Sequence, residues 1–192
     1  MRLVILGGPG AGKGTQAEGI SQHLDIPSIS TGEVLRNAIA NQTNLGQKAR
    51  PYVEKGELVP DEIMIKFIHQ RLLQADVTQG WLLDGYPRTA FQAEELDFLL
   101  ENLGQQLNWA IYLNVPKDVL ANRTIHRSRS DDKPLIIRRR IELFYQRTIP
   151  ILEYYSLRDR LLDINGNQPP EQVQQEIISQ LRDSATSSAS NS

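Results

Sequence analysis

Residues 3–16 of the 192-residue chain read LVILGGPGAGKGTQ, and no other segment constrains the architecture as strongly. The first four residues form an apolar run with β-branched members, which is typical of a buried parallel strand. The run continues directly into the spacing G-x-x-x-x-G-K, in which small residues let consecutive backbone N–H groups surround an anion. A helix beginning near Gly14 adds the positive end of its dipole. The stretch therefore predicts a strand, a phosphate-binding loop and a helix, with Lys13 as a mobile positive charge.

The composition is that of an ordinary globular protein. Hydrophobic residues make up 40% of the chain and charged residues 23%, and the net charge of −2 indicates neither a nucleic acid nor an anionic membrane as partner. The chain has no cysteine, which excludes disulfides and thiolate zinc sites. Because there is no basic-then-apolar leader and no apolar run of membrane length, we expect a cytoplasmic protein.

Apolar runs of strand length alternate with segments of helical spacing. The runs are residues 3–6, 26–29, 81–83, 110–115 and 161–164. This alternation predicts an α/β fold with a five-stranded parallel sheet covered by helices on both faces. In such a sheet, ligands bind at the carboxyl ends of the strands, so the residues that follow each strand are candidates for a site.

Residues 31–73 are too long for one crossover helix. Gly56 and Pro60 divide the interval, and the spacing of apolar residues predicts helices at 34–40, 44–54 and 60–73. We expect a helical arm over about residues 30–60, beside the phosphate-binding loop.

The second half of the chain continues the same domain, which we expect to span residues 1–182. A helix begins near Pro116, a short polar interruption covers about residues 127–134, and a long helix follows over 135–155. The serine-rich residues 183–192 have little to bury and are expected to form a disordered tail.

Two polar segments belong to the arm. In STGEVLR (30–36), Ser30 or Thr31 can cap a helix, but capping does not account for Arg36, so the segment is either a cap alone or a cap combined with a site. In GELVPDE (56–62), Asp61 and Glu62 are interpreted as first-turn acids that favour the helix dipole.

The segment WLLDGYPRT (81–89) carries a stronger signal. An acid at the end of an apolar strand places the Asp84 carboxylate beside the phosphate-binding loop, where it can orient water around a Mg²⁺ ion. Turn propensity accounts for Asp84, Gly85 and Pro87, but it does not account for Arg88.

A basic cluster follows, consisting of Arg123, Arg127, Arg129, Arg138, Arg139 and Arg140. Arg138 and Arg139 are interpreted as a solvated helix face. Arg123 and Arg127 are four residues apart and share one face of a helix. Phosphoryl transfer needs planar, permanently charged donors around the migrating group, and these arginines supply them.

Taken together, GGPGAGKGTQ, TGEVLR, DGYPRT and the arginines resemble the adenylate kinases, a family of nucleoside monophosphate kinases, over about residues 1–180. The variant G-K-G-T, with Gly14 after the lysine and Thr15 one place later, is typical of these kinases. The resemblance implies a P-loop kinase fold and the Mg²⁺-dependent reaction ATP + AMP ⇌ 2 ADP. With Ser128 alone between Arg127 and Arg129, it also implies a very short lid without zinc, in a monomer.

The resemblance further implies roles for single residues. ATP is expected at Gly10, Ala11, Gly12, Lys13, Gly14, Thr15, Arg123, Arg127 and Gln168. AMP is expected at Thr31, Arg36, Glu57, Leu58, Val59, Gly85, Tyr86, Pro87, Arg88, Gln92, Arg129 and Arg140. The catalytic set is Lys13, Arg88, Arg127, Arg129 and Arg140, with Asp84 binding Mg²⁺ through water and Asp131 and Asp132 holding the lid arginines.

Three other functions are compatible with parts of the pattern. A uridylate/cytidylate kinase shares the loop and the arginines, but Thr31 and Thr89 stand where those relatives typically have Ala and Asn. A regulatory GTPase is disfavoured because the chain has no N-K-x-D guanine-binding motif. A catalytically inactive nucleotide-binding module is disfavoured because Lys13, Arg88 and the lid arginines are all present.

Overall fold

The computed structural model describes residues 1–125 and 133–189, and a five-stranded parallel sheet lies at its centre. The strands are β1 (Arg2–Leu6), β2 (Ser28–Ser30), β3 (Trp81–Asp84), β4 (Trp109–Asn114) and β5 (Leu161–Asn165), in the order β2-β3-β1-β4-β5. The predicted α/β class and the five-stranded parallel sheet are thus confirmed. The second strand begins two residues later than the predicted 26–29 and ends at Ser30.

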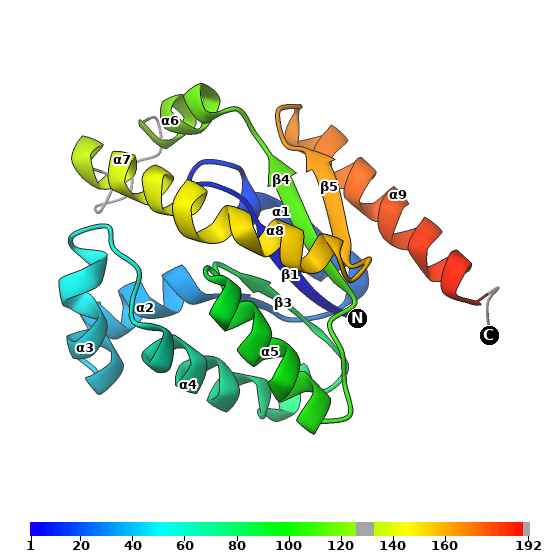
Figure 1. The fold of residues 1–192 in the computed structure, drawn as a ribbon, viewed down its shortest axis with the longest axis horizontal. Helices are drawn as coiled ribbons and strands as arrows, with labels where there is room; N and C mark the ends of the chain where they lie inside the picture. The colour runs from blue at the N-terminus through cyan, green and yellow to red at the C-terminus, as the bar shows by residue number, and fades with distance from the viewer. Residues whose placement is uncertain (126–132, 190–192) are drawn as a thin grey trace.

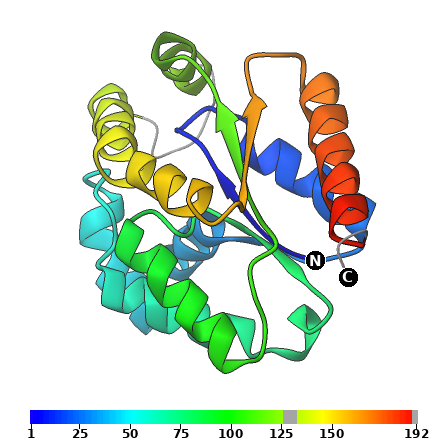
Figure 2. The same ribbon diagram turned by 45° about the vertical axis from the view of Figure 1, so that its right-hand side comes forward.

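The helices are α1 (Lys13–Leu24), α2 (Thr31–Ala40), α3 (Asn44–Val53), α4 (Asp61–Leu72), α5 (Ala90–Asn102), α6 (Lys117–Ile125), α7 (Pro134–Leu143), α8 (Ile149–Ser156) and α9 (Pro170–Ala189). A short 3₁₀ turn, η1 (Ala75–Val77), precedes β3, and a π-helical turn, η2 (Phe144–Thr148), joins α7 to α8. Helices α1 and α9 cover one face of the sheet, while α5 and α8 lie over the other (Figures 1 and 2).

Both faces of the sheet are buried, because successive strand residues point to opposite sides. In β1, Val4 and Leu6 belong to the core that includes the α5 and α8 side chains, whereas Leu3 and Ile5 belong to the core formed with α1 and α9. The apolar run that predicted a buried strand therefore contributes side chains to the cores on both faces of the sheet. Because it is buried on both faces, the end of β1 is held in place beneath the phosphate-binding loop.

The prediction of one uninterrupted helix over residues 135–155 is wrong, because a π turn at Phe144–Thr148 separates α7 from α8. The amide of Ile149 donates to the carbonyl of Phe144, five residues back, which widens the turn. Pro150 follows immediately, and in a regular α-helix its ring would collide with the carbonyl of Gln146. The wide turn ahead of the proline accommodates this ring.

The last helix also differs from the expectation. Helix α9 continues to Ala189, so residues 183–189 of the expected disordered tail are helical. Val173, Ile177 and Leu181 anchor the helix against the core, and local hydrogen bonds can extend a helix beyond its last buried residue.

Residues 190–192 and residues 126–132, which include most of the expected lid, lie outside the described part of the chain. Within the described ranges, no helix combines the length and apolar character needed to span a membrane.

Candidate active site

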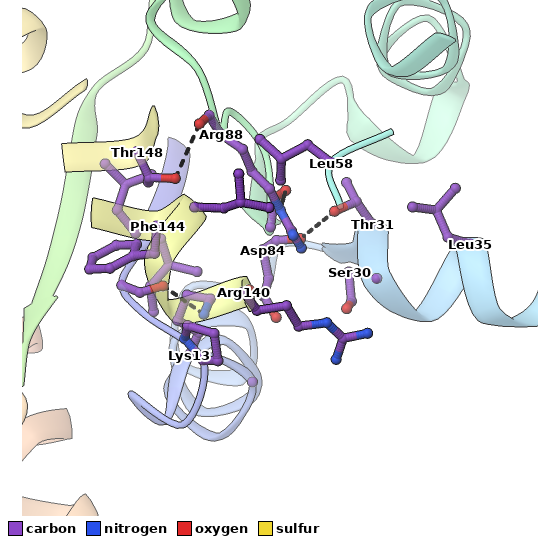
Figure 3. Close-up of a pocket in the computed structure, with 18 of the residues that line it drawn as sticks. Lys13, Ser30, Thr31, Leu35, Leu58, Asp84, Arg88, Arg140, Phe144 and Thr148 are labelled. Atoms are coloured by element: carbon purple, nitrogen blue, oxygen red, sulfur yellow. Dashed lines mark hydrogen bonds between the residues drawn. The ribbon is translucent and has the colours of Figure 1, made fainter. Parts of the chain in front are cut away.

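A cavity of about 790 Å³ opens at the carboxyl ends of β1, β2 and β3. Its walls include the phosphate-binding loop, the start of α2, residues 56–59, the loop after β3, and the α7–η2 segment. Figure 3 shows Lys13, Arg88 and Arg140 around this cavity, each contributed by a different one of these segments. The topology therefore brings polar groups from distant parts of the sequence to one edge of the sheet.

The phosphate-binding loop precedes α1 and needs glycine at particular positions. Gly10 has φ 83°, and a Cβ atom there would lie 2.6 Å from Thr124 Oγ1 and 2.7 Å from the Leu120 carbonyl oxygen. The loop therefore packs tightly on α6 and keeps a left-handed turn that side chains rarely adopt. Lys13 begins α1, and its Nζ donates to the carbonyl oxygens of Gly7 at 2.9 Å and Gly8 at 3.1 Å. The lysine thus lies across the loop in the cavity wall.

Arg88 is held from two sides in the loop after β3. Its Nε donates to the Gly85 carbonyl oxygen at 2.7 Å, and Thr148 Oγ1 donates to the Arg88 carbonyl oxygen at 3.1 Å (Figure 3). Desolvation lowers the pKa of the Arg88 guanidinium, Asp84 opposes this shift, and the charges of Arg140 and Arg36 add to it. Three guanidinium groups near one another in a cavity wall are suited to a polyanionic ligand.

Thr31 and Asp84 lie side by side at the ends of β2 and β3. Ser30 caps α2, with the Glu33 amide donating to Ser30 Oγ at 3.4 Å, so Thr31 is free of the capping role that its position also allowed. Thr31 is buried and its hydroxyl donates to the Asp84 carbonyl oxygen at 3.1 Å (Figure 3). Asp84 pairs in register with Ile5 of β1, which brings its carboxylate next to the strand that leads into the phosphate-binding loop.

Gln92 lines the cavity, and both ends of its amide have protein partners. The Arg88 backbone N–H donates to Gln92 Oε1 at 2.8 Å, and Gln92 Nε2 donates to Asp61 Oδ1 at 2.7 Å. The expectation that Asp61 serves only the helix dipole is therefore wrong. No local pattern could have indicated this contact, because the two residues are 31 positions apart in sequence.

Glu57, which is expected to bind AMP, lines the cavity, but its carboxylate faces Arg139 of α7. Arg139 Nε donates to Glu57 Oε1 at 2.7 Å and Nη2 donates to Oε2 at 3.2 Å. This ion pair holds the pKa of Glu57 below its ordinary value, chiefly through the hydrogen bond from Arg139. The interpretation of Arg139 as a purely solvated residue is wrong, whereas Arg138 is exposed as expected.

Most of the predicted residues within the described ranges meet in the cavity wall. They are Gly10, Gly12, Lys13, Gly14, Thr15, Thr31, Arg36, Glu57, Leu58, Val59, Asp84, Gly85, Pro87, Arg88, Gln92, Arg123 and Arg140. Arg127, Arg129, Asp131 and Asp132 lie outside the described residues.

Three predicted residues lie behind or beside the wall. Ala11 is buried in the core under the loop. Tyr86 is buried, and its hydroxyl donates to the Gln92 carbonyl oxygen at 3.2 Å, so it supports the wall from behind. Gln168 Nε2 donates to the Asn165 carbonyl oxygen and to Glu176, while the neighbouring turn contacts Arg123 through the Gly166 carbonyl oxygen at 3.0 Å.

The wall residues that sequence reasoning missed include several apolar side chains and the Thr148 hydroxyl. Leu35, Val53, Met64, Leu143, Phe144 and Thr148 all line the cavity. Their spacing is that of ordinary helix core, which carries no separate signal for a site. Within residues 1–125 and 133–189, no group of three or more His, Cys, Asp and Glu side chains is placed to hold a metal ion.

Comparisons with known proteins agree with this geometry. A family model described as adenylate kinase matches residues 5–160. The chain is 61% identical over 178 residues to adenylate kinase 2 of Nostoc sp. strain PCC 7120, covering 93% of this chain and 97% of that protein. It is 55% identical over 181 residues to adenylate kinase 2 of Synechocystis sp. strain PCC 6803, covering 94% and 100%.

A more distant relative differs in length. The adenylate kinase of Caldicellulosiruptor saccharolyticus is 38% identical over 212 aligned residues, covering 94% of this chain and 99% of that protein. Since the alignment is longer than the 192 residues of this chain, that relative carries insertions that this chain lacks.

Proposed function

This chain belongs to the adenylate kinase family, and we propose that it catalyses the reversible phosphoryl transfer ATP + AMP ⇌ 2 ADP. One observation supports this reaction in addition to membership of the family. A single cavity is lined by the phosphate-binding loop with its lysine and by Arg36, Arg88 and Gln92, which are expected to bind AMP. A cavity of this kind accommodates two nucleotides whose phosphates meet between Lys13 and the arginines.

The proposed mechanism needs no protein nucleophile, because an oxygen of the AMP phosphate attacks the terminal phosphorus of ATP directly. The loop amides and Lys13 hold the donor phosphates, while Arg88 and Arg36 hold the acceptor phosphate. Arg140, together with Arg127 and Arg129, supplies the positive charge that the transferring group needs as charge spreads over its oxygens. The catalytic gain comes from alignment and fixed charge, both of which a rigid wall provides.

Magnesium fits the residues around the donor phosphates. Asp84 offers a carboxylate beside the end of β1, and hard cations such as Mg²⁺ prefer oxygen ligands and retain water. When bound with ATP, the ion neutralises phosphate charge. Asp84 would hold it through water, as expected from the sequence. Thr31, by donating to the Asp84 backbone, positions this strand end.

AMP is the proposed acceptor, and a uridylate/cytidylate kinase is the alternative. Thr31 is buried in the wall, and Gln92 offers both a donor and an acceptor, as an adenine edge requires. Turnover of AMP, UMP and CMP with Mg-ATP tests the choice. We expect AMP to have the highest kcat/KM, and faster turnover of UMP or CMP would end the AMP assignment.

The remaining expectations extend this proposal. A very short lid over about residues 127–134 stays a prediction, and its closure over the substrates would exclude water from the transferring phosphoryl group. The cytoplasmic location and the monomeric state stay predictions, to be checked by cell fractionation and by sedimentation velocity.

A further inference from the structure

Asp61, a carboxylate that does not line the cavity, holds the amide that does. Asp61 is the first residue of α4, and Gln92 lies in the first turn of α5. Gln92 is 2% exposed, and its Nε2 donates to Asp61 Oδ1 at 2.7 Å. Gln92 belongs to the cavity wall and Asp61 stands behind it. An effect of Asp61 on a ligand therefore passes through residues that it holds, of which Gln92 is the one in the cavity wall.

The two partners of the Gln92 amide allow only one orientation. An ionised carboxylate can only accept hydrogen bonds, so Asp61 must face the NH₂ group. The Arg88 backbone N–H can only donate, and it meets Oε1 at 2.8 Å. If the amide were rotated by half a turn, Oε1 would face the Asp61 carboxylate, which is also an acceptor, and the NH₂ group would face the Arg88 N–H, which is also a donor. Both contacts would leave buried polar groups without a hydrogen bond.

The same carboxylate is itself held in place. Thr89 Oγ1 donates to Asp61 Oδ1 at 3.3 Å, and the Gln92 backbone N–H donates to Thr89 Oγ1 at 3.1 Å. Tyr86 supports the backbone of Gln92 through its hydroxyl. Asp61 thus joins the start of α4 to the start of α5 through a closed set of hydrogen bonds, which is more than its place in a first helical turn requires.

We infer that Asp61 is a positioning residue that sets the preference for adenine by holding the Gln92 amide in one orientation. This inference rests on the proposed function. An amide has two N–H groups and two oxygen lone pairs, of which the protein uses one each, so one donor and one acceptor remain for a base. Adenine presents an amino donor beside a ring-nitrogen acceptor, whereas guanine has a carbonyl acceptor in place of the amino group. With Oε1 fixed to receive the amino group, guanine would set two acceptors against each other.

The test compares Asp61→Ala with Asp61→Asn, which keeps an acceptor oxygen, and with Glu62→Ala, which removes the exposed neighbouring acid of the same helical turn. Initial rates are measured with Mg-ATP and with AMP or GMP. For Asp61→Ala we expect a KM for AMP raised about tenfold and an AMP/GMP ratio of kcat/KM lowered about tenfold, with the KM for ATP unchanged. Asp61→Asn should recover most of the preference, and Glu62→Ala should match the original protein.

The outcomes separate the inference from the function on which it rests. If the unaltered protein forms no ADP from Mg-ATP and AMP, the proposed function fails. If it does form ADP, but Asp61→Ala retains the KM for AMP and the AMP/GMP ratio, the inference is overturned. Equal losses in Asp61→Asn and Asp61→Ala would also overturn it, because the acceptor oxygen would then be irrelevant.

A second measurement covers the case in which Asp61→Ala does not fold. Asp61→Leu removes the acceptor while filling the space, and it is subject to the same kinetic criteria. In addition, the Gln92 side-chain ¹⁵N–¹H signals should exchange slowly with water in the unaltered protein and in Asp61→Asn. Fast exchange of these signals in the unaltered protein would show that the amide is not held, and would overturn the inference.

Discussion

Arg139 of α7 forms a two-point ion pair with Glu57, which precedes α4 by four residues and lies 82 positions earlier in the sequence. The side chains are 38% and 36% exposed, so water still reaches both. Close to this pair, Gly56 packs against Ile136, where a Cβ atom on the glycine would lie 2.9 Å from Ile136 Cγ2. The arm over about residues 30–60 is therefore in direct contact with the helix that carries Arg140.

Arg139→Ala should remove the ion pair between α7 and Glu57 of the arm without unfolding the protein. We expect little change in thermal stability, because exposed ion pairs contribute little, but a KM for AMP raised about threefold. Steady-state kinetics at low and high salt measure the effect, which should shrink as salt screens the pair. Arg138→Ala, which removes a neighbouring exposed charge, is the matched control, and an equal effect in that variant would assign the change to net charge alone.

The same ion pair predicts a pH dependence. The pKa of Glu57 lies below its ordinary value of 4.5, so ionised Glu57 favours the folded, paired state. Its contribution is fully present above pH 4.5 and is lost as the pH falls through the lowered pKa of the folded state. The difference in unfolding free energy between the original protein and Glu57→Gln should be constant at neutral pH and vanish in acid. A difference that grows in acid would contradict the pairing.

Arg88→Ala should reduce kcat strongly with modest effects on folding. Loss of one preorganised donor at the transferring group costs about 3 kcal/mol of transition-state stabilisation, or roughly a hundredfold in rate. Arg88→Lys should recover only part of this loss, since an ammonium keeps the charge but not the planar fork. Single-turnover rates with Mg-ATP and AMP provide the measurement. Near-normal turnover in Arg88→Ala would remove Arg88 from the site.

Gly85→Ala tests the close approach of Thr31 and Arg88 at the end of β3. Gly85 has φ 88°, and an added Cβ atom would lie 2.6 Å from Thr31 Oγ1 and 3.1 Å from Arg88 Nη2. We expect a loss of about 1–2 kcal/mol in stability from backbone strain, together with a clear rise in the KM for AMP.

Gly104→Ala is the control for that strain. Gly104 also has a positive φ of 64°, but an added Cβ atom would meet no heavy atom within 4 Å. It should lose comparable stability and keep normal kinetics, as measured by chemical denaturation and initial rates. Equal kinetic losses in the two variants would show that the collision with Thr31 and Arg88 has no part in the effect.

Features that depend on neighbouring residues could be predicted from the chain alone. The apolar run at 3–6, the glycine-rich loop and the acid at the end of β3 are local patterns, and each has a direct physical meaning. The parallel sheet followed from their alternation with helices, and the rule that ligands bind at strand ends then indicated the location of the site. Assigning roles to Thr31 or Gln92 required the resemblance to a family, because a hydroxyl or an amide has many ordinary uses.

Tertiary structure alone revealed the contacts between residues far apart in sequence. Asp61 with Gln92, Glu57 with Arg139, and Thr148 with Arg88 are paired across 31, 82 and 60 positions. Polar side chains leave no periodic trace of such pairing, because water can satisfy each of them equally well in the unfolded chain. The π turn at Phe144–Thr148, which places Phe144 and Thr148 in the cavity wall, could not be predicted from the sequence either. A helix that changes its hydrogen-bond spacing over one turn keeps nearly the same pattern of apolar residues.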